Sequence, residues 1–118
     1  QNMIKKKYGR IINTSSIGVK FGGGANTFSY SLSKHLNEFI PGDLRKLCSH
    51  NILYNTLRIG VTDTKFHNKV KNKSIRKRIK LIPIKKMAST EDIVNYIIYL
   101  IGKNNFIANE VINITGGE

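Results

Sequence analysis

Tyr30 and Lys34 are the two residues whose types and spacing are best suited to chemistry. In a helix, residues four positions apart lie on one face, with Cβ atoms roughly 6 Å apart. A free phenol titrates near about 10, so proton transfer near neutral pH requires its anion to be stabilised by roughly 4 kcal/mol. An ammonium group about 4 to 5 Å away supplies roughly 3 to 4 kcal/mol at an effective dielectric constant near 20. The pair could therefore give or take a proton.

A second Tyr-x-x-x-Lys sequence, Tyr99 to Lys103, shows that this spacing alone is not specific. The two matches differ in what precedes them. Tyr30 follows an apolar run, two serines and a loop, which places it near the carboxyl end of an expected strand. Open parallel sheets bind ligands at that end. Tyr99 lies late in an amphipathic segment without such a lead-in, and we interpret it as structural.

The elements that must position Tyr30 and Lys34 alternate between strands and helices. Short apolar runs rich in β-branched residues predict strands over 10–14, 51 or 52 to 58, and 110–114. The first eight residues are expected to form the C-terminal part of a helix. Asn26 or Thr27 can cap the helix that carries Tyr30. Pro41 should break that helix, and residues 43–49 are expected to resume it. This order predicts an α/β fold with a parallel sheet and right-handed crossovers.

Two of the expected helices have apolar faces. Ser89 and Asp92 form a capping-box pattern that opens a helix reaching about Lys103. The apolar residues expected on the two helices are Leu32, Leu36, Phe39 and Ile40 on the first, and Ile93, Ile97, Leu100 and Ile101 on the last.

Two further segments could indicate phosphate binding or nucleic-acid binding. The loop 18–24 contains Gly22-Gly23-Gly24, but neither a P-loop nor a complete G-x-G-x-x-G is present, so we interpret it as a flexible loop. Lys69 to Lys80 is strongly basic, and Ile75, Ile79 and Ile82 recur at helical spacing. That pattern favours an amphipathic helix with a solvated basic face over a nucleic-acid-binding surface.

Composition limits the classes of protein. The 118 residues are 40% hydrophobic, which suits one small domain with a core. The net charge of +13 reflects Lys spread over the whole chain rather than one patch. Cys48 is the single cysteine, which agrees with a reducing, cytoplasmic compartment. The widely spaced His35, His50 and His67 predict no metal site, and neither a membrane span nor a secretory signal is expected.

Four stretches, in order and spacing, resemble the C-terminal half of a short-chain dehydrogenase/reductase. Gly9 to Ser16 looks like the family's fifth strand and catalytic serine, and Tyr30 to Lys34 like its catalytic helix. Asn55 to Thr64 is similar to the sixth strand and the Asn-x-x-x-Pro-Gly-x-x-x-Thr turn, although Ile59 replaces the usual Pro. Met87 to Gly117 resembles the last helix and seventh strand. The resemblance implies a partial Rossmann-like, doubly wound parallel sheet made of the last three strands with their helices.

This resemblance implies an NAD(P)-dependent oxidoreductase that transfers a hydride between nicotinamide and a carbonyl or alcohol substrate. Tyr30 would give or take the proton of the substrate oxygen. Lys34 would ease that transfer and bond to the cofactor ribose. Ser16 would hold the substrate oxygen, with Ser15 as the less favoured holder. Without the resemblance, both serines can equally be turn residues at the end of a strand.

Further cofactor contacts follow from the same resemblance. Backbone groups of Ile59, Gly60 and Val61 would bracket the nicotinamide. Thr64 would reach the nicotinamide amide or the phosphates. From the residues alone, Thr64 can equally be an ordinary helix cap.

Several parts of the family pattern have no counterpart between Gln1 and Glu118. These are the first βαβ unit with its Gly-rich phosphate turn, the residue that selects NAD or NADP, and the active-site Asn. We therefore expect a fragment or one piece of a split gene, with residues 1–118 as the catalytic half of a single domain. The alternative is a catalytically inactive remnant or interaction module with the same fold.

The substrate pocket is expected to be lined by residues 18–24 and 65–86, and the basic charge favours an anionic molecule such as a sugar nucleotide or an acyl carrier. The full-length protein is expected to form a homo-oligomer through its catalytic and last helices.

Overall fold

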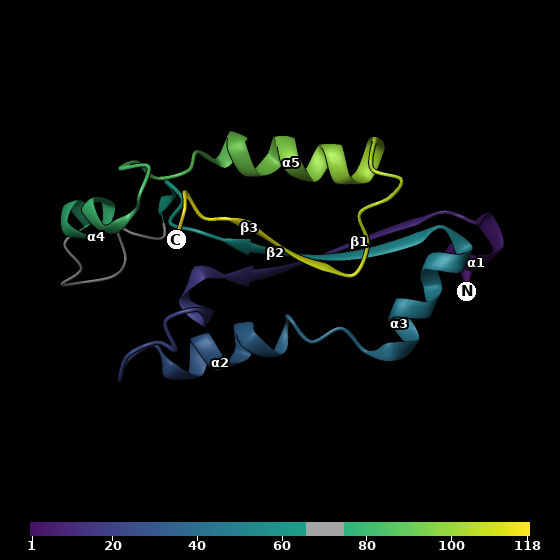
Figure 1. The fold of residues 1–118 in the computed structure, drawn as a ribbon, viewed down its shortest axis with the longest axis horizontal. Coiled ribbons are helices and arrows are strands. Elements are labelled where there is room, and N and C mark those ends of the chain that lie inside the picture. Colours follow the sequence, from purple (N-terminus) through teal and green to yellow (C-terminus); the bar gives the residue numbers. More distant parts are fainter. Residues whose placement is uncertain (66–74) are drawn as a thin grey trace.

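A three-stranded parallel sheet forms the centre of the computed structural model, which describes residues 1–65 and 75–118. Its strands are β1 (Gly9–Ser16), β2 (Ile52–Ile59) and β3 (Glu110–Ile114), in the order β1-β2-β3. Figure 1 shows helix α5 (Thr90–Gly102) over one face and helices α2 (Phe28–Leu36) and α3 (Gly42–Lys46) over the other. The predicted α/β fold with a parallel sheet is confirmed.

The remaining elements lie at the two ends of the sheet (Figure 1). Helix α1 (Asn2–Lys6) precedes β1, and the short turn η1 (Ile17–Val19) follows it. The turn η2 (Leu47–His50) leads into β2, and helix α4 (Ile75–Leu81) lies near the carboxyl ends of the strands. Of the predicted basic helix, 75–80 is helical, whereas 69–74 lies outside the described residues.

Helix α5 begins at the predicted capping box. The Ser89 hydroxyl oxygen accepts a bond of 3.0 Å from the Asp92 backbone N–H, and the Asp92 carboxylate accepts one of 2.8 Å from the Ser89 N–H. These reciprocal bonds satisfy two donors that the first turn would otherwise leave unpaired. They also hold the pKa of the Asp92 carboxyl below its usual value.

The core centres on β2, whose residues are buried from Ile52 to Leu57. On α5, Ile93 and Leu100 are buried as their spacing predicts, while Ile101 is exposed. Helix α2 differs more from expectation, because the apolar residues Leu32, Leu36 and Phe39 are exposed and only Ile40, beyond its end, is buried. The link between α2 and the sheet must therefore come partly from other side chains.

Two boundaries differ from those predicted. Strand β1 continues through Ser15 and Ser16, because both still pair in register with β2. Helix α2 ends at Leu36, earlier than the break expected at Pro41. A physical reason is that side chains of the sheet bond to carbonyl oxygens at its C-terminal end. Asn13 Nδ2 donates to the Asn37 oxygen at 2.9 Å, and these bonds take the place of further helical turns.

The pairing register brings the ends of all three strands to one edge. Ser16 lies opposite Ile59, and Ile59 lies opposite Ile114. The turns that follow the strands therefore adjoin one another, as expected for a site at the carboxyl edge of a parallel sheet. Among the described residues, no helix is both long and apolar enough to cross a membrane.

Candidate active site

Ser16, Tyr30 and Ser31 come together around Gly18. The Gly18 N–H donates to the Ser16 hydroxyl oxygen at 3.2 Å, which closes the turn after β1. A Cβ atom added at Gly18 would lie 3.3 Å from Ser31 Oγ, 3.5 Å from Ser16 Oγ and 4.0 Å from Tyr30 Cε1. The missing side chain of Gly18 thus lets the end of β1 approach α2 closely.

Lys34 lies beside Tyr30 on α2. Its Nζ atom is 6.0 Å from the centroid of the Tyr30 ring and donates to the Thr14 carbonyl oxygen at 3.3 Å. The Tyr30 side chain is 50% exposed, so a ligand can reach it. The backbone of β1 therefore holds the ammonium group next to the phenol. Ser16, Tyr30 and Lys34, which the sequence singled out, all lie at the carboxyl end of β1.

The two serines at the end of β1 have different surroundings. Ser15 is buried, and its hydroxyl lies 3.1 Å from the Lys34 carbonyl oxygen and 2.7 Å from Glu38 Oε1. Its single hydrogen is committed to these acceptors. Ser16 is only partly buried, and its hydroxyl oxygen accepts the bond from Gly18. Of the two, Ser16 has the hydroxyl that still carries a hydrogen for a ligand.

A polar cluster that sequence reasoning missed joins α2 to all three strands; we call it the α2 clamp and define it as Ser15, Glu38, Arg58 and Asn113. Arg58 donates to Glu38 through Nε at 2.8 Å and Nη2 at 2.6 Å, and to Asn113 Oδ1 through Nη1 at 3.1 Å. Ser15, Arg58 and Asn113 are successive partners across the sheet. One signal existed in the sequence: Glu38 is an acid one turn beyond Lys34, in a chain with 7 acidic residues.

The clamp predicts an acid-sensitive contribution to stability. The hydrogen bonds of Arg58, and then that of Ser15, hold the pKa of the Glu38 carboxyl below its usual value against the opposing effect of burial. The charge of His35, on α2, adds to the lowering. This contribution is fully present above the unfolded-state value of about 4.3 and is lost as the pH falls through the lower folded-state pKa. We expect thermal melts between about pH 6 and 3 to show that loss of stability. In Glu38→Gln, the loss over the same pH range should be smaller. An equal acid response in both proteins would contradict the assignment.

The turn after β2 contains the residues that the resemblance assigns to nicotinamide. The Gly60 N–H donates to the Ile114 oxygen at 2.8 Å, and the Val61 carbonyl accepts from the Ala88 N–H at 3.0 Å. A Cβ atom at Gly60 would lie 2.8 Å from Thr115 Cα, so only glycine allows this approach between the two strand ends. The Gly60 N–H is thus committed within the chain, whereas the Val61 carbonyl can accept a second bond. Thr64 is exposed, and the residues it could cap lie beyond the described range.

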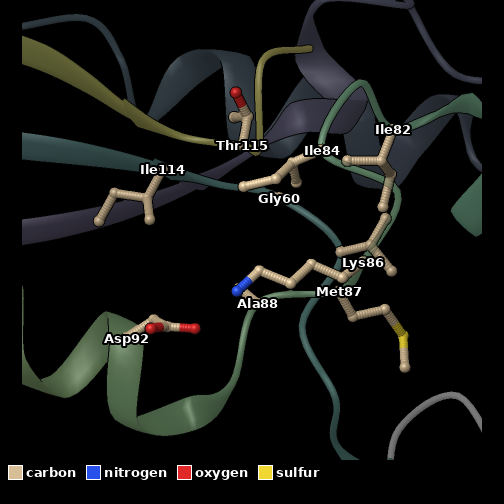
Figure 2. Close-up of a pocket in the computed structure, with 11 residues that line it drawn as sticks. Gly60, Ile82, Ile84, Lys86, Met87, Ala88, Asp92, Ile114 and Thr115 are labelled. Atoms are coloured by element: carbon tan, nitrogen blue, oxygen red, sulfur yellow. The ribbon is translucent and has the colours of Figure 1, made fainter.

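Two pockets open at this edge. The first, of about 190 Å³, lies between the turn after β2, the end of β3 and the start of α5. Figure 2 shows the Lys86 side chain running across it towards Asp92. Ligand pockets usually measure roughly 300–1,000 Å³, so this pocket is small for a substrate. The second, of about 510 Å³, lies within that range.

The second pocket lies between segments that are distant in the sequence. Lys20 and Phe21 come from the loop after β1, Arg78 and Leu81 from α4, and Glu118 from beyond β3. Arg78 is paired with Glu118 through Nη2 and Oε2 at 2.7 Å. Among the described residues, no acidic side chain forms an ion pair with Lys20, the other cation at this pocket. The pocket therefore adjoins the loop that carries Gly18.

The second Tyr-x-x-x-Lys sequence lies at the opposite end of the sheet. Lys103 is the residue after α5, and the Tyr8 hydroxyl at the start of β1 donates to the neighbouring Ile101 oxygen at 2.6 Å. The Tyr99 ring stacks at 5.9 Å on Tyr96. Over residues 1–65 and 75–118 no group of His, Cys, Asp or Glu could hold a metal ion; His67 lies outside these ranges.

Comparisons with known proteins find similar sequences and structures. A family model described as enoyl-(acyl carrier protein) reductase matches residues 1–118. A 3-oxoacyl-(acyl-carrier-protein) reductase of Aquifex aeolicus is 30% identical over 99% of the chain and 48% of that protein. The chain thus spans about half the length of the curated relatives it matches.

Solved structures are similar over nearly the whole chain. ElxO with NADP bound is 27% identical, with a TM-score of 0.83 over 98% of the chain and 48% of ElxO. A 3-oxoacyl (acyl-carrier-protein) reductase of Agrobacterium tumefaciens with NADP bound is 22% identical, with a TM-score of 0.82 over 98% of the chain and 47% of that protein. At that identity, the second likeness supports the fold alone.

Proposed function

The chain belongs to the short-chain dehydrogenase/reductase family, and from this we propose that it is the catalytic half of an NADP(H)-dependent reductase. The observation that carries the proposal is the meeting of Ser16, Tyr30 and Lys34 at the carboxyl edge of the sheet. The other half of the domain would supply the Gly-rich phosphate turn and the active-site Asn. As in the sequence interpretation, a cytoplasmic location forms part of the proposal.

The residues present fit the nicotinamide end of such a cofactor. Lys34 and Tyr30 offer an ammonium and a phenol side by side, and the backbone from Ile59 to Val61 lies at the same strand edge. We assign the ribose to Lys34 and Tyr30, the ring to the 59–61 backbone, and the amide or phosphates to Thr64. When bound, the nicotinamide supplies or accepts the hydride. We place NADP ahead of NAD because the similar ElxO structure holds NADP.

The proton chemistry then belongs to this chain. The Ser16 hydroxyl donates a hydrogen bond to the substrate carbonyl oxygen and orients it. The Tyr30 hydroxyl donates its proton to that oxygen as the carbon is reduced, and takes it back in the reverse direction. The Lys34 ammonium stabilises the phenolate left on Tyr30, since a nearby positive charge favours the anion.

We propose a 3-oxoacyl thioester as the substrate class, because the relatives reduce such groups by name. The second pocket is suited to this role in size and place, since it opens between the loop after β1 and α4. Lys20 on its rim would favour an anionic carrier attached to the thioester. The exposed apolar residues on the outer faces of α2 and α5 are proposed to pair with a second copy of the full-length protein.

The test combines this chain with the N-terminal half of a related 3-oxoacyl reductase. NADPH oxidation is measured with acetoacetyl-N-acetylcysteamine as the probe, and complex formation is measured by gel filtration. We expect a complex that oxidises NADPH faster than either half alone. A complex that forms but neither binds NADPH nor oxidises it would overturn the proposal and favour the interaction module.

A further inference from the structure

The structure carries one inference beyond the three residues proposed for catalysis. We propose that Glu38 and Arg58, acting through Ser15, are positioning residues that fix α2 at the angle which sets Tyr30 and Lys34 against Ser16. The effect of this orientation on catalysis rests on the proposed function. The statement that these residues fix the orientation of α2 does not depend on it.

The first argument is the nature of the contact between α2 and the sheet. Leu32, Leu36 and Phe39 are exposed, so apolar packing does little to fix this helix. Side chains of the sheet instead reach polar groups at its C-terminal end. Ser15 donates to the Lys34 oxygen or to Glu38. Thr56 donates to the Asn37 oxygen at 3.3 Å. Arg58 donates two hydrogen bonds to Glu38.

The second argument is the burial and rigidity of the clamp. The Glu38 side chain is 9% exposed and that of Arg58 is 21% exposed. Two parallel bonds between a guanidinium and a carboxylate fix the relative orientation of the two groups as well as their distance. Arg58 on β2 is also bonded to Asn113 on β3, so the turn that follows α2 is fixed relative to two strands at once.

The third argument is leverage. The clamp holds the turn that directly follows α2, and the helix ends at Leu36, six residues beyond Tyr30, which is about 9 Å along a helix. A tilt of about 6° at that end would move the Tyr30 ring by about 1 Å over that length. Displacements of about this size can reduce the rate of a catalysed reaction by up to about 100-fold. The clamp includes Ser15, the neighbour of Ser16, so it contacts both the end of β1 and the segment that follows Tyr30 and Lys34.

The experiment uses the 118-residue chain labelled with 3-fluorotyrosine, and reads the fluorine resonance of Tyr30, assigned through Tyr30→Phe. Two variants release the clamp. Glu38→Gln removes the charge while keeping the shape. Glu38→Leu with Arg58→Met replaces the ion pair by an apolar pair, so the chain should stay folded. We expect the Tyr30 resonance to shift or broaden in both variants.

Ser89→Ala is the matched control, because it removes the cap of α5 on the other face of the sheet and lowers the melting temperature without touching α2. Its Tyr30 resonance should stay in place. A Tyr30 resonance unchanged in both clamp variants would overturn the proposal, and so would an equal change in Ser89→Ala.

A second readout links the clamp to catalysis. In the enzyme reconstituted from two halves, Glu38→Gln is expected to lower kcat about tenfold while KM changes less than about twofold. If the wild-type halves form a complex that neither binds NADPH nor oxidises it, the proposed function fails, while the fluorine result still decides whether the clamp positions α2. If activity is present and kcat is unchanged in Glu38→Gln, the catalytic meaning of the clamp is overturned.

Discussion

Tyr30→Phe is expected to reduce hydride transfer in the reconstituted enzyme by about 10²- to 10⁴-fold, the range that a positioned acid or base contributes. The substitution removes one oxygen atom from a side chain that is 50% exposed, so the fold should be unaffected. The loss should fall on kcat, because the proton moves only in the transition state. NADPH oxidation with the thioester probe measures it, alongside NADPH affinity by fluorescence titration.

Tyr99→Phe is the matched control for this substitution. Tyr99 has a Lys four residues later, as Tyr30 does, but lies at the amino end of the sheet. Its variant should keep wild-type kcat. Full activity in Tyr30→Phe would show that another group supplies the proton, and a similar loss in both variants would point to a general effect on folding.

The strands were predictable because their signals are local. Buried parallel strands are rich in apolar and β-branched residues, and 10–14, 52–58 and 110–114 are short segments of this composition. The capping box of α5 is also local, since Ser89 and Asp92 are three residues apart. The edge at which Tyr30 lies follows from chain order once the sheet is parallel. These parts of the fold depend on short-range patterns that a single sequence displays.

The α2 clamp could not be predicted because it depends on register. Ser15, Arg58 and Asn113 are 43 and 55 residues apart, and they meet only because β1, β2 and β3 pair with these residues opposite one another. Likewise, the leucines of α2 have helical spacing, yet the structure leaves them exposed. Spacing identifies a shared face, but only the partner decides whether that face is buried. Sequence patterns therefore located the candidate site without revealing what holds α2 in place.

The largest effect on stability is expected from breaking the ion pair of the clamp on one side only. Arg58→Met leaves the Glu38 carboxylate, 9% exposed, with Ser15 as its remaining clamp partner. We expect the free energy of unfolding to fall by roughly 2 to 4 kcal/mol, since removing one partner of a buried pair leaves an uncompensated charge. Glu38→Leu should cost less, because Arg58 is more exposed and keeps its bond to Asn113. Urea unfolding at pH 7 measures both.

The double variant distinguishes a paired contribution from two separate ones. Glu38→Leu with Arg58→Met removes both charges, and an apolar pair in their place should bring stability back to within about 1 kcal/mol of the wild type. The sum of the two single losses would then exceed the loss in the double variant by more than about 1 kcal/mol.

The exposed pair of Lys46 and Asp43 provides the contrast, because its side chains are 81% and 93% exposed. Asp43→Asn should change stability by less than about 0.5 kcal/mol. If the losses of the two clamp single variants simply add in the double variant, Glu38 and Arg58 do not act as a unit. The clamp would then have no energetic basis, and the orientation of α2 would have to come from the bonds that Asn13 and Thr56 donate to Asn37.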